Sequence, residues 1–230
     1  VIETLYAPGG PPDTSSKSRI HAVATFSLQY ALSEVLRSWN VRPTIVYGEG
    51  VGECVAAVVA GIVSLEEGLR LALQRGGELF ASEEKEVRYQ KPKSSMVASL
   101  TGCLVGVEHP ISSEYWDRQS RESADGAVAV QTMDREDCSI FLEFSSGMFK
   151  WEVADHVRGL QDSYCLSCLA ESHDEWEHLL ETSAKLFVSG FDVDWQEVYP
   201  GTDSQKITLP TYPFKLGKRY WFEDDTKDDI

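Results

Sequence analysis

Apolar residues form long stretches with helical spacing, and these stretches alternate with short unbroken apolar runs. Between Ile20 and Ser38 apolar side chains recur every three or four residues, which predicts an amphipathic helix. The short runs, such as Thr44 to Tyr47 and Ser139 to Phe144, lack alternating polar positions. That pattern is typical of strands that are covered on both faces. The chain is therefore expected to build a sheet between helical layers.

Further segments continue the alternation. The other expected helices are Gly52–Gly61, Ser64–Phe80, Ser112–Gln119, Ala124–Met133 and Asp174–Val188, and the other strands are Met96–Leu100 and Tyr164–Leu169. Ser64, followed three residues later by Glu67, fits a capping box at a helix start. Because helices separate the strands, the pattern predicts parallel crossovers and a three-layer α/β sandwich with a mainly parallel sheet.

Composition divides the chain into four segments. Residues 1–18 are rich in proline, glycine and serine and are expected to form a lead-in, and residues 19–189 form the α/β domain. Residues 190–222 are expected to form an extended linker, because prolines in Leu209 to Phe214 forbid a helix. Its many aromatic side chains need a surface to pack against. Residues 223–230 form an acidic tail that is expected to be disordered.

The most informative motif is Gly48-Glu49-Gly50-Val51-Gly52-Glu53, which follows the strand ending at Tyr47 and opens an alanine- and valine-rich stretch. This is the strand–turn–helix context of a nucleophile elbow, G-x-S-x-G. The middle residue of an elbow carries the attacking oxygen. Here that residue is Gly50, so the loop is kept and the nucleophile is missing.

The residues around this motif resemble the acyltransferase domain of modular polyketide synthases, whose motif reads G-H-S-x-G-E. The matching blocks are Arg19–Trp39, Val46–Glu67, Gly68–Phe80 with Gln74-Arg75-Gly76, Ser94–Gly102, Glu114–Glu122, Ile140–Glu143, Leu186–Trp195 and Leu209–Phe214 with Arg219-Tyr220-Trp221. They occur in family order over nearly the whole chain. The resemblance implies an acyltransferase-like domain followed by the linker that comes after it in the family.

The departures from the family are specific. Glu49 and Gly50 stand where the family has the histidine and serine of the elbow. No counterpart of the family's amino-terminal G-Q-G-S-Q strand precedes Val1. Only Ala81 to Lys93 occupies the place of a ferredoxin-like subdomain that carries the catalytic histidine, and its strands alone would need about five residues each. The family's G-P-H-P has become Ser145 to Met148.

These departures imply a catalytically inactive domain that spaces or docks its neighbours. The implied partners are ketosynthase and acyl carrier protein domains of the same polypeptide, or an acyltransferase that acts in trans. One alternative is an enzyme with altered chemistry, in which Glu49 or an unrecognised base activates water, or Cys54 is a displaced nucleophile. Another is a binding pocket in which Arg75, matching the family's carboxylate-binding arginine, holds an acyl thioester. Arg75 also fits an ordinary cation near a helix end.

Charge and cysteines narrow the picture further. A net charge of −16 argues against nucleic acid and against anionic membranes, and it suits a partner with a basic face. Val55–Val63 is too short to span a bilayer. Cys165 and Cys168 form a C-x-x-C without the second pair typical of metal sites. We expect free thiols, no metal, no cofactor and a cytoplasmic piece of a longer polypeptide.

Overall fold

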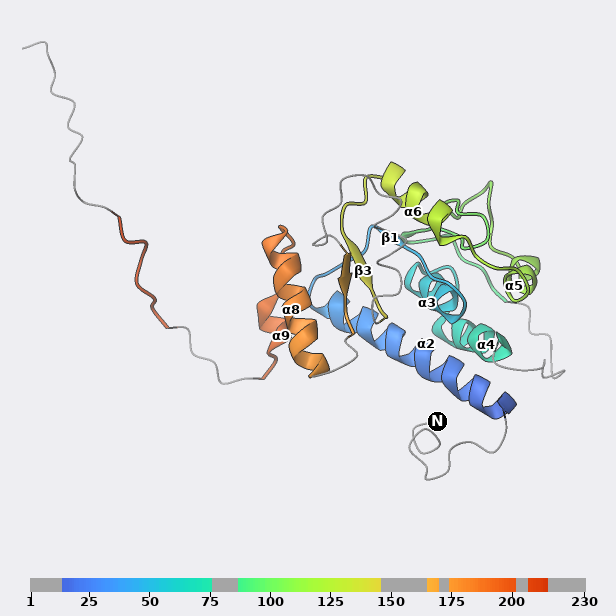
Figure 1. The fold of residues 1–230 in the computed structure, drawn as a ribbon, viewed down its shortest axis with the longest axis horizontal. Coiled ribbons are helices and arrows are strands. Elements are labelled where there is room, and N and C mark those ends of the chain that lie inside the picture. Colours follow the sequence, from blue (N-terminus) through green and yellow to red (C-terminus); the bar gives the residue numbers. More distant parts are fainter. Residues whose placement is uncertain (1–13, 76–86, 146–164, 170–173, 202–206, 215–230) are drawn as a thin grey trace, which may run out of the picture. The chain divides into compact units, whose positions relative to one another are not determined.

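The computed structural model describes residues 14–75, 87–145, 165–169, 174–201 and 207–214, with the backbone alone at 14–17. Its contacts divide the chain into two units, Val1–Val198 and Tyr199–Ile230. The first unit contains the α/β structure (Figure 1). Its described elements are α2 (Thr14–Ser38), β1 (Ile45–Val46), α3 (Val51–Val59), α4 (Leu65–Arg75), β2 (Ser95–Met96), α5 (Ser113–Gln119), α6 (Gly126–Arg135), β3 (Phe141–Glu143), β4 (Cys165–Ser167), α8 (Glu175–Val188) and α9 (Trp195–Val198).

The described strands pair in parallel, as the sequence predicts. Strand β1 pairs with β2, and Ile45 lies opposite Ser95. Strand β3 pairs with β4, and Phe141 lies opposite Cys165. The regular pairing is shorter than the apolar runs, because the chain after β2 turns back and Val97 forms an antiparallel bridge with Leu104. The alternation of helices with parallel strands confirms the α/β class.

Both faces of the strands pack against helices. Successive residues of a strand point to opposite faces, so neighbouring residues belong to different hydrophobic clusters. Phe141 of β3 and Val97 next to β2 pack with Val130 of α6. Their neighbours Leu166 of β4 and Met96 of β2 belong to two other clusters, formed with α8 and the end of α2 in one case and with α3 in the other. Helical layers thus lie on both sides of the strands, and the three-layer prediction is confirmed.

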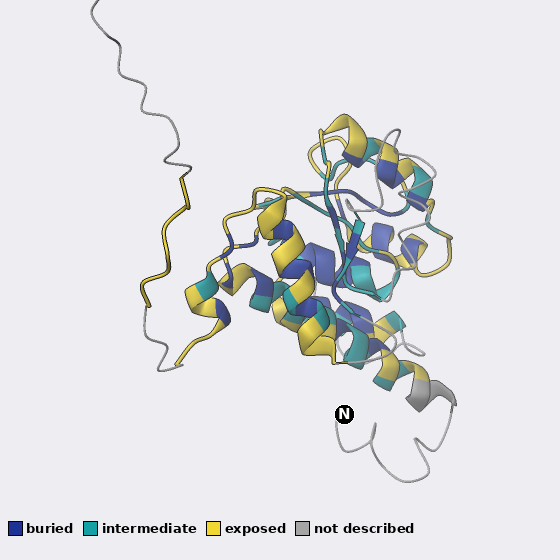
Figure 2. Cartoon of the chain, turned by 60° about the vertical axis from the view of Figure 1, so that its left-hand side comes forward, coloured by how far each residue is buried: buried dark blue, intermediate teal, exposed yellow. Residues whose placement is uncertain are grey.

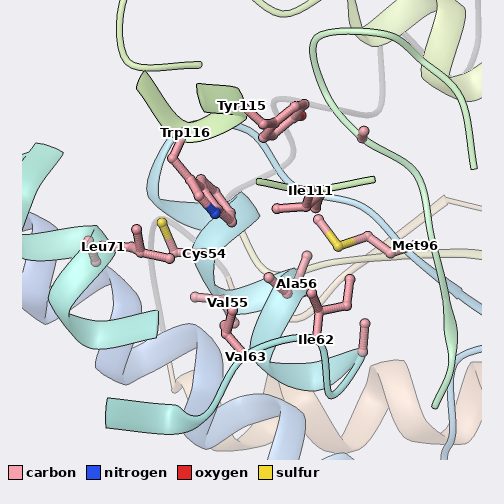
Figure 3. Close-up of a cluster of buried hydrophobic side chains, with 14 of the residues drawn as sticks. Cys54, Val55, Ala56, Ile62, Val63, Leu71, Met96, Ile111, Tyr115 and Trp116 are labelled. Carbon is pink, nitrogen blue, oxygen red and sulfur yellow. The ribbon is translucent and has the colours of Figure 1, made fainter. Parts of the chain in front are cut away.

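The largest cluster joins α3 to its neighbours. Helix α3 is buried along most of its length, and Cys54 and Ala57 have no exposed surface. Figure 3 shows its side chains converging with those of α4, β2 and α5, among them Leu71, Met96 and Trp116. Figure 2 colours the residues by burial: α3 is mostly buried, whereas α8 is largely exposed on its outer side. The largest core cluster is therefore built around α3, the helix that begins directly after Gly50.

Several element boundaries differ from the predicted ones. Helix α2 begins at Thr14, six residues before the predicted helix start at Ile20. Helix α4 is described to Arg75, and the rest of the predicted helix to Phe80 lies outside the described residues. The short helix α9 was not predicted. Val193 and Val198 are buried with α8, so the division between units falls after Val198, whereas the sequence-based boundary lies after Ser189.

The second unit is described at 199–201 and 207–214 and contains no helix or strand at these residues. Tyr212 and Phe214 pack edge to face with ring centroids 4.9 Å apart. Of the aromatic residues expected to pack in the linker, Trp195 is half-buried in the first unit, whereas Phe191, Tyr199, Tyr212 and Phe214 are exposed. Residues 215–222 lie outside the described part. Among the described residues, no helix is long and apolar enough to cross a membrane.

Candidate functional site

The elbow keeps its sharp turn without a side chain at its tip. Gly50 lies between β1 and α3 with φ 58° and ψ −123°, in the left-handed range of φ that favours glycine. The backbone N–H of Gly52 donates to the carbonyl of Glu49 at 2.8 Å, which closes the turn. Gly50 is the N-cap of α3 and supplies no side-chain oxygen to it. The structure therefore has a tight glycine turn between β1 and α3, as the sequence motif predicts.

Gly48 is required by a close approach of two backbones. A Cβ at this position would lie 2.3 Å from the carbonyl carbon and oxygen of Gly52. Gly52 itself has room, since its Cβ would lie 3.5 Å from the Oε1 of Gln29. The first glycine of the motif therefore allows the turn to fold back on the helix, independently of any catalysis.

Arg75 is brought to the elbow from the end of α4. Its Nη2 donates to the backbone carbonyl of Gln119, whose side-chain amide donates to the carbonyl of Gly50 at 3.2 Å. The Nη1 of Arg75 lies 3.2 Å from the position that a Cβ of Gly50 would take. The structure thus brings together two predicted residues, and Gln119, which sequence reasoning missed, links them.

Part of this contact is left without hydrogen bonds. Among the described residues, the Nε of Arg75 and the Oε1 of Gln119 are buried and have no hydrogen-bond partner. The guanidinium therefore keeps N–H groups beside the elbow that could donate hydrogen bonds to an anionic group.

Glu49 occupies the place next to Gly50 but faces solvent. Its side chain is exposed, and its Oε1 accepts a hydrogen bond from the hydroxyl of Tyr47 at 2.5 Å. These surroundings are those of a surface carboxylate.

Glu53, the last residue of the motif, is a buried carboxyl group that sequence reasoning did not single out. It has no exposed surface, and it accepts hydrogen bonds from the backbone N–H of Ser99 at 2.8 Å, the hydroxyl of Ser99 at 2.5 Å and the hydroxyl of Tyr115 at 2.5 Å. Burial raises the pKa of Glu53 above its ordinary value, although these hydrogen bonds oppose the rise. The sequence signal that could have identified Glu53 is its charge at the start of an otherwise apolar helix.

The remaining candidate nucleophile and bases are poorly placed. Cys54 is buried, and burial raises the pKa of its thiol to about 12, which makes it inert. His21 and His109 are exposed, and His178 contacts the carbonyl of Ser167 through its Nε2 at 3.0 Å. None of these three histidines hydrogen-bonds an elbow residue, and the other two histidines lie outside the described residues.

The sequence also singled out Val51, Cys165 and Cys168, and each of these belongs to or packs against a hydrophobic cluster. Val51 opens α3 and is half-buried against the core. Cys165 lies on β4 and Cys168 follows it, and burial raises the pKa of Cys168 to about 12. Within the described ranges, no three histidine, cysteine or acidic side chains are grouped as a metal site would require. A cavity of about 240 Å³ lies against α5, and its lining includes Thr101, His109 and Arg118 but no elbow residue.

Comparison with known proteins places this geometry in context. No family model matches the sequence. The chain is 24% identical to the polyketide synthase GfsB of Streptomyces halstedii over 87% of its own length, and 27% identical to the spectinabilin polyketide synthase system protein NorC of Streptomyces orinoci over 96%. It spans only 5% and 10% of these two relatives.

Solved structures agree in fold. The acyltransferase domain from the second module of the salinomycin polyketide synthase superposes with a TM-score of 0.73 at 22% identity, over 84% of this chain and 66% of that one. The acyl transferase domain of ZmaA gives a TM-score of 0.74 at 16% identity, over 90% of this chain and 69% of that one. These likenesses establish the fold.

Proposed function

Because the chain has the fold of polyketide synthase acyltransferase domains and resembles them in sequence, we propose that it is a catalytically inactive acyltransferase-like domain of a polyketide synthase. The observation that carries this proposal is Gly50, which occupies the nucleophile position of an intact elbow turn. Acyl transfer through an ester needs a nucleophile, a base within hydrogen-bond reach and donors for the oxyanion. Gly50 supplies no attacking atom, Glu49 is exposed, and Cys54 is held as a neutral thiol.

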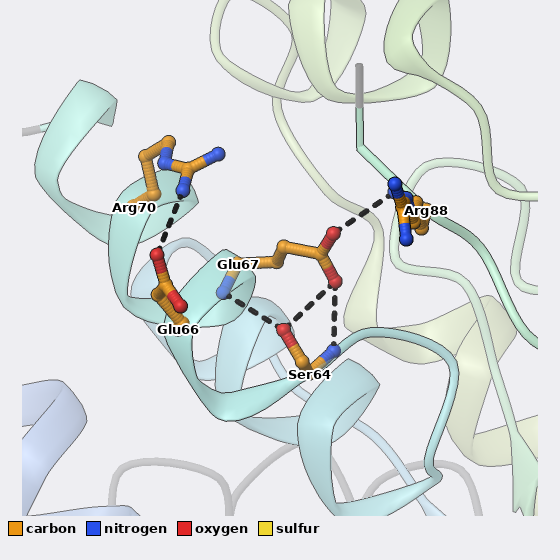
Figure 4. Close-up of polar contacts among 5 residues, drawn as sticks. All are labelled: Ser64, Glu66, Glu67, Arg70 and Arg88. Carbon is orange, nitrogen blue, oxygen red and sulfur yellow. Dashed lines mark hydrogen bonds and ion pairs between the residues drawn. The ribbon is translucent and has the colours of Figure 1, made fainter. Parts of the chain in front are cut away.

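The shortened connection after α4 supports the same proposal. Glu67 caps its own helix with Ser64, as the sequence predicts, and its other carboxylate oxygen accepts from the backbone N–H of Arg88 at 3.0 Å (Figure 4). The backbone N–H of Gln90 then donates to the carbonyl of Ile62 at 2.7 Å. Hydrogen bonds therefore connect the segment before β2 directly to α4 and to the turn before α4. In the family that the chain resembles, a histidine-bearing subdomain is inserted in this region.

A structural role follows for a domain without chemistry. We infer that it spaces and orients a ketosynthase and later domains of the same polypeptide, or that it docks an acyl carrier protein or an acyltransferase acting in trans. The intact core supports this role, because the fold is kept although Gly50 stands at the nucleophile position.

A second candidate is a non-catalytic site for a carboxylated acyl thioester. Its specific support is the guanidinium of Arg75, which lies beside the elbow and whose buried Nε has no hydrogen-bond partner among the described residues. An enzyme that uses Glu49 as a base has no comparable support, because that side chain is exposed.

The first prediction is that the protein forms no acyl-enzyme. After incubation with malonyl- or acetyl-coenzyme A, intact-mass spectrometry is expected to show the mass of the unmodified chain, because Gly50 supplies no attacking atom and Cys54 is held as a neutral thiol. A stoichiometric adduct would overturn the proposed inactivity, and mapping it to Cys54 would identify a displaced nucleophile. Retention of malonyl-coenzyme A without an adduct, lost in Arg75→Gln, would favour the binding pocket.

A second prediction is that Gly50→Ser does not restore turnover. The serine supplies an attacking oxygen but no base, and the members of a catalytic triad act as a unit. Its Cβ would lie at φ 58° and 3.2 Å from the Nη1 of Arg75, so the free energy of unfolding is expected to fall by about 1 kcal/mol. Thiol release from malonyl-coenzyme A should match that of Gly106→Ser, a control at an open position. Faster release by Gly50→Ser alone would reveal a base near the elbow.

A further inference from the structure

Helix α8 carries partly exposed apolar side chains along one edge of its core-facing side. Leu179, Thr182 and Leu186 are buried against the domain. At the edge of this buried side, about 20–40° around the helix from the fully buried Ser183, Trp176 and Phe187 are 48% and 51% exposed. At 3.6 residues per turn these two positions differ by only about 20° around the helix. Leu180 lies beside them in projection and is half-buried, so a partly exposed apolar stripe runs along the edge of the buried side of the helix.

An acidic row accompanies this stripe. Glu177 and Glu181 are exposed one turn apart, and they project about 100–140° from Trp176 around the helix axis. Acidic residues also surround the helix on both sides in sequence: residues 174–198 hold seven acidic residues, and Lys185 is their one lysine or arginine. The face therefore combines apolar anchors with negative charge.

The two aromatic anchors are held in place by neighbours. Trp176 packs edge to face on Trp39, which is buried, with ring centroids 5.6 Å apart. Phe187 packs edge to face on Trp195, also at 5.6 Å. Aromatic side chains fixed before binding lose little rotational freedom when a partner covers them, which is typical of anchor residues in interfaces.

We propose that this face, defined by Trp176, Leu180 and Phe187 with Glu177 and Glu181, docks an amphipathic helix from another protein or domain. The apolar stripe of that helix lies on the aromatic anchors, and its lysines or arginines face the two glutamates. Charge selects this occupant: a second copy would bring the same acidic face, and each chain carries a net charge of −16. The surface specifies a partner for the docking role proposed above, and it needs nothing from the elbow.

A designed peptide tests the proposal on the full chain. The probe is a labelled helix of about three heptads with leucine at positions a and d and lysine at e and g. We expect saturable binding by fluorescence anisotropy, weakened at least tenfold in Glu177→Lys/Glu181→Lys. The control Asp134→Lys/Glu136→Lys, with the same change of net charge at exposed positions near the end of α6, should leave the affinity unchanged.

The apolar part of the surface is tested separately. Phe187→Ser is expected to weaken binding about tenfold, whereas Leu28→Ser, at a similarly exposed position of α2, should have no effect. A peptide with glutamate at e and g should bind the Glu177→Lys/Glu181→Lys variant more tightly than the parent chain. Circular dichroism of each variant confirms that a loss of binding is not a loss of fold.

Other outcomes would overturn the proposal. Absence of saturable binding, or equal loss in both double variants, would show that the face selects no basic helix. A photocrosslinking residue at Val188 that reacts with residues 199–230 of the same chain, or with a second copy, would identify a different occupant. The acyl-adduct assay reads only the elbow, so failure here is distinguishable from failure of the proposed inactivity.

Discussion

Glu53→Leu is expected to destabilise the protein by about 3 kcal/mol or more. The substitution would leave three buried donors without an acceptor: the N–H and hydroxyl of Ser99 and the hydroxyl of Tyr115. Each unsatisfied buried donor costs about 1–3 kcal/mol. Urea denaturation followed by circular dichroism measures the change. Glu114→Leu, on the exposed side of α5, is the matched control and should change stability little.

The same carboxyl group is expected to make stability depend on pH. Because burial raises the pKa of Glu53, the folded state holds its proton to a higher pH than the unfolded state does. The resulting stabilisation is complete below the unfolded pKa of about 4.5 and is lost as the pH rises through the folded pKa. Glu53→Gln keeps the shape but cannot titrate. The parent chain should lose stability relative to Glu53→Gln over this range, and parallel curves would contradict the raised pKa.

Gly48→Ala is expected to lower the free energy of unfolding by about 3 kcal/mol. Its Cβ would lie 2.3 Å from backbone atoms of Gly52, which cannot move without opening the turn or shifting α3. The control is Gly52→Ala, whose Cβ would make an ordinary contact at 3.5 Å with Gln29. Because alanine favours a helix over glycine, this control should be neutral or stabilising by about 0.5–1 kcal/mol.

Thermal and urea unfolding of the two variants decide the matter. Equal stability of Gly48→Ala and Gly52→Ala would show that the elbow turn is not held closed in solution. A selective loss in Gly48→Ala would show that the turn is structurally necessary although Gly50 has no nucleophile.

Most of the helices and strands are predictable from local sequence patterns. Helical spacing located the segments of α2, α3, α4, α5, α6 and α8, and the short apolar runs located the four strands. These features follow from neighbours within a few residues, so one sequence suffices to find them. Boundaries were less accurate: α2 begins at Thr14 because helical backbone continues beyond the apolar stripe, and α9 is too short to produce a period.

The sequence by itself determined the alternation of helices and strands and the glycine turn between β1 and α3, because each depends on residues adjacent in the chain. Only the tertiary structure decided which distant groups meet. Glu53 finds Ser99 and Tyr115 at separations of 46 and 62 residues, and Gln119 reaches Gly50 across 69. The packing of α4 and α5 around α3 selects these contacts. Likewise, Trp176 and Phe187 look like core residues in sequence, and packing leaves them half exposed because they lie at the edge of the side of α8 that packs on β4 and α2.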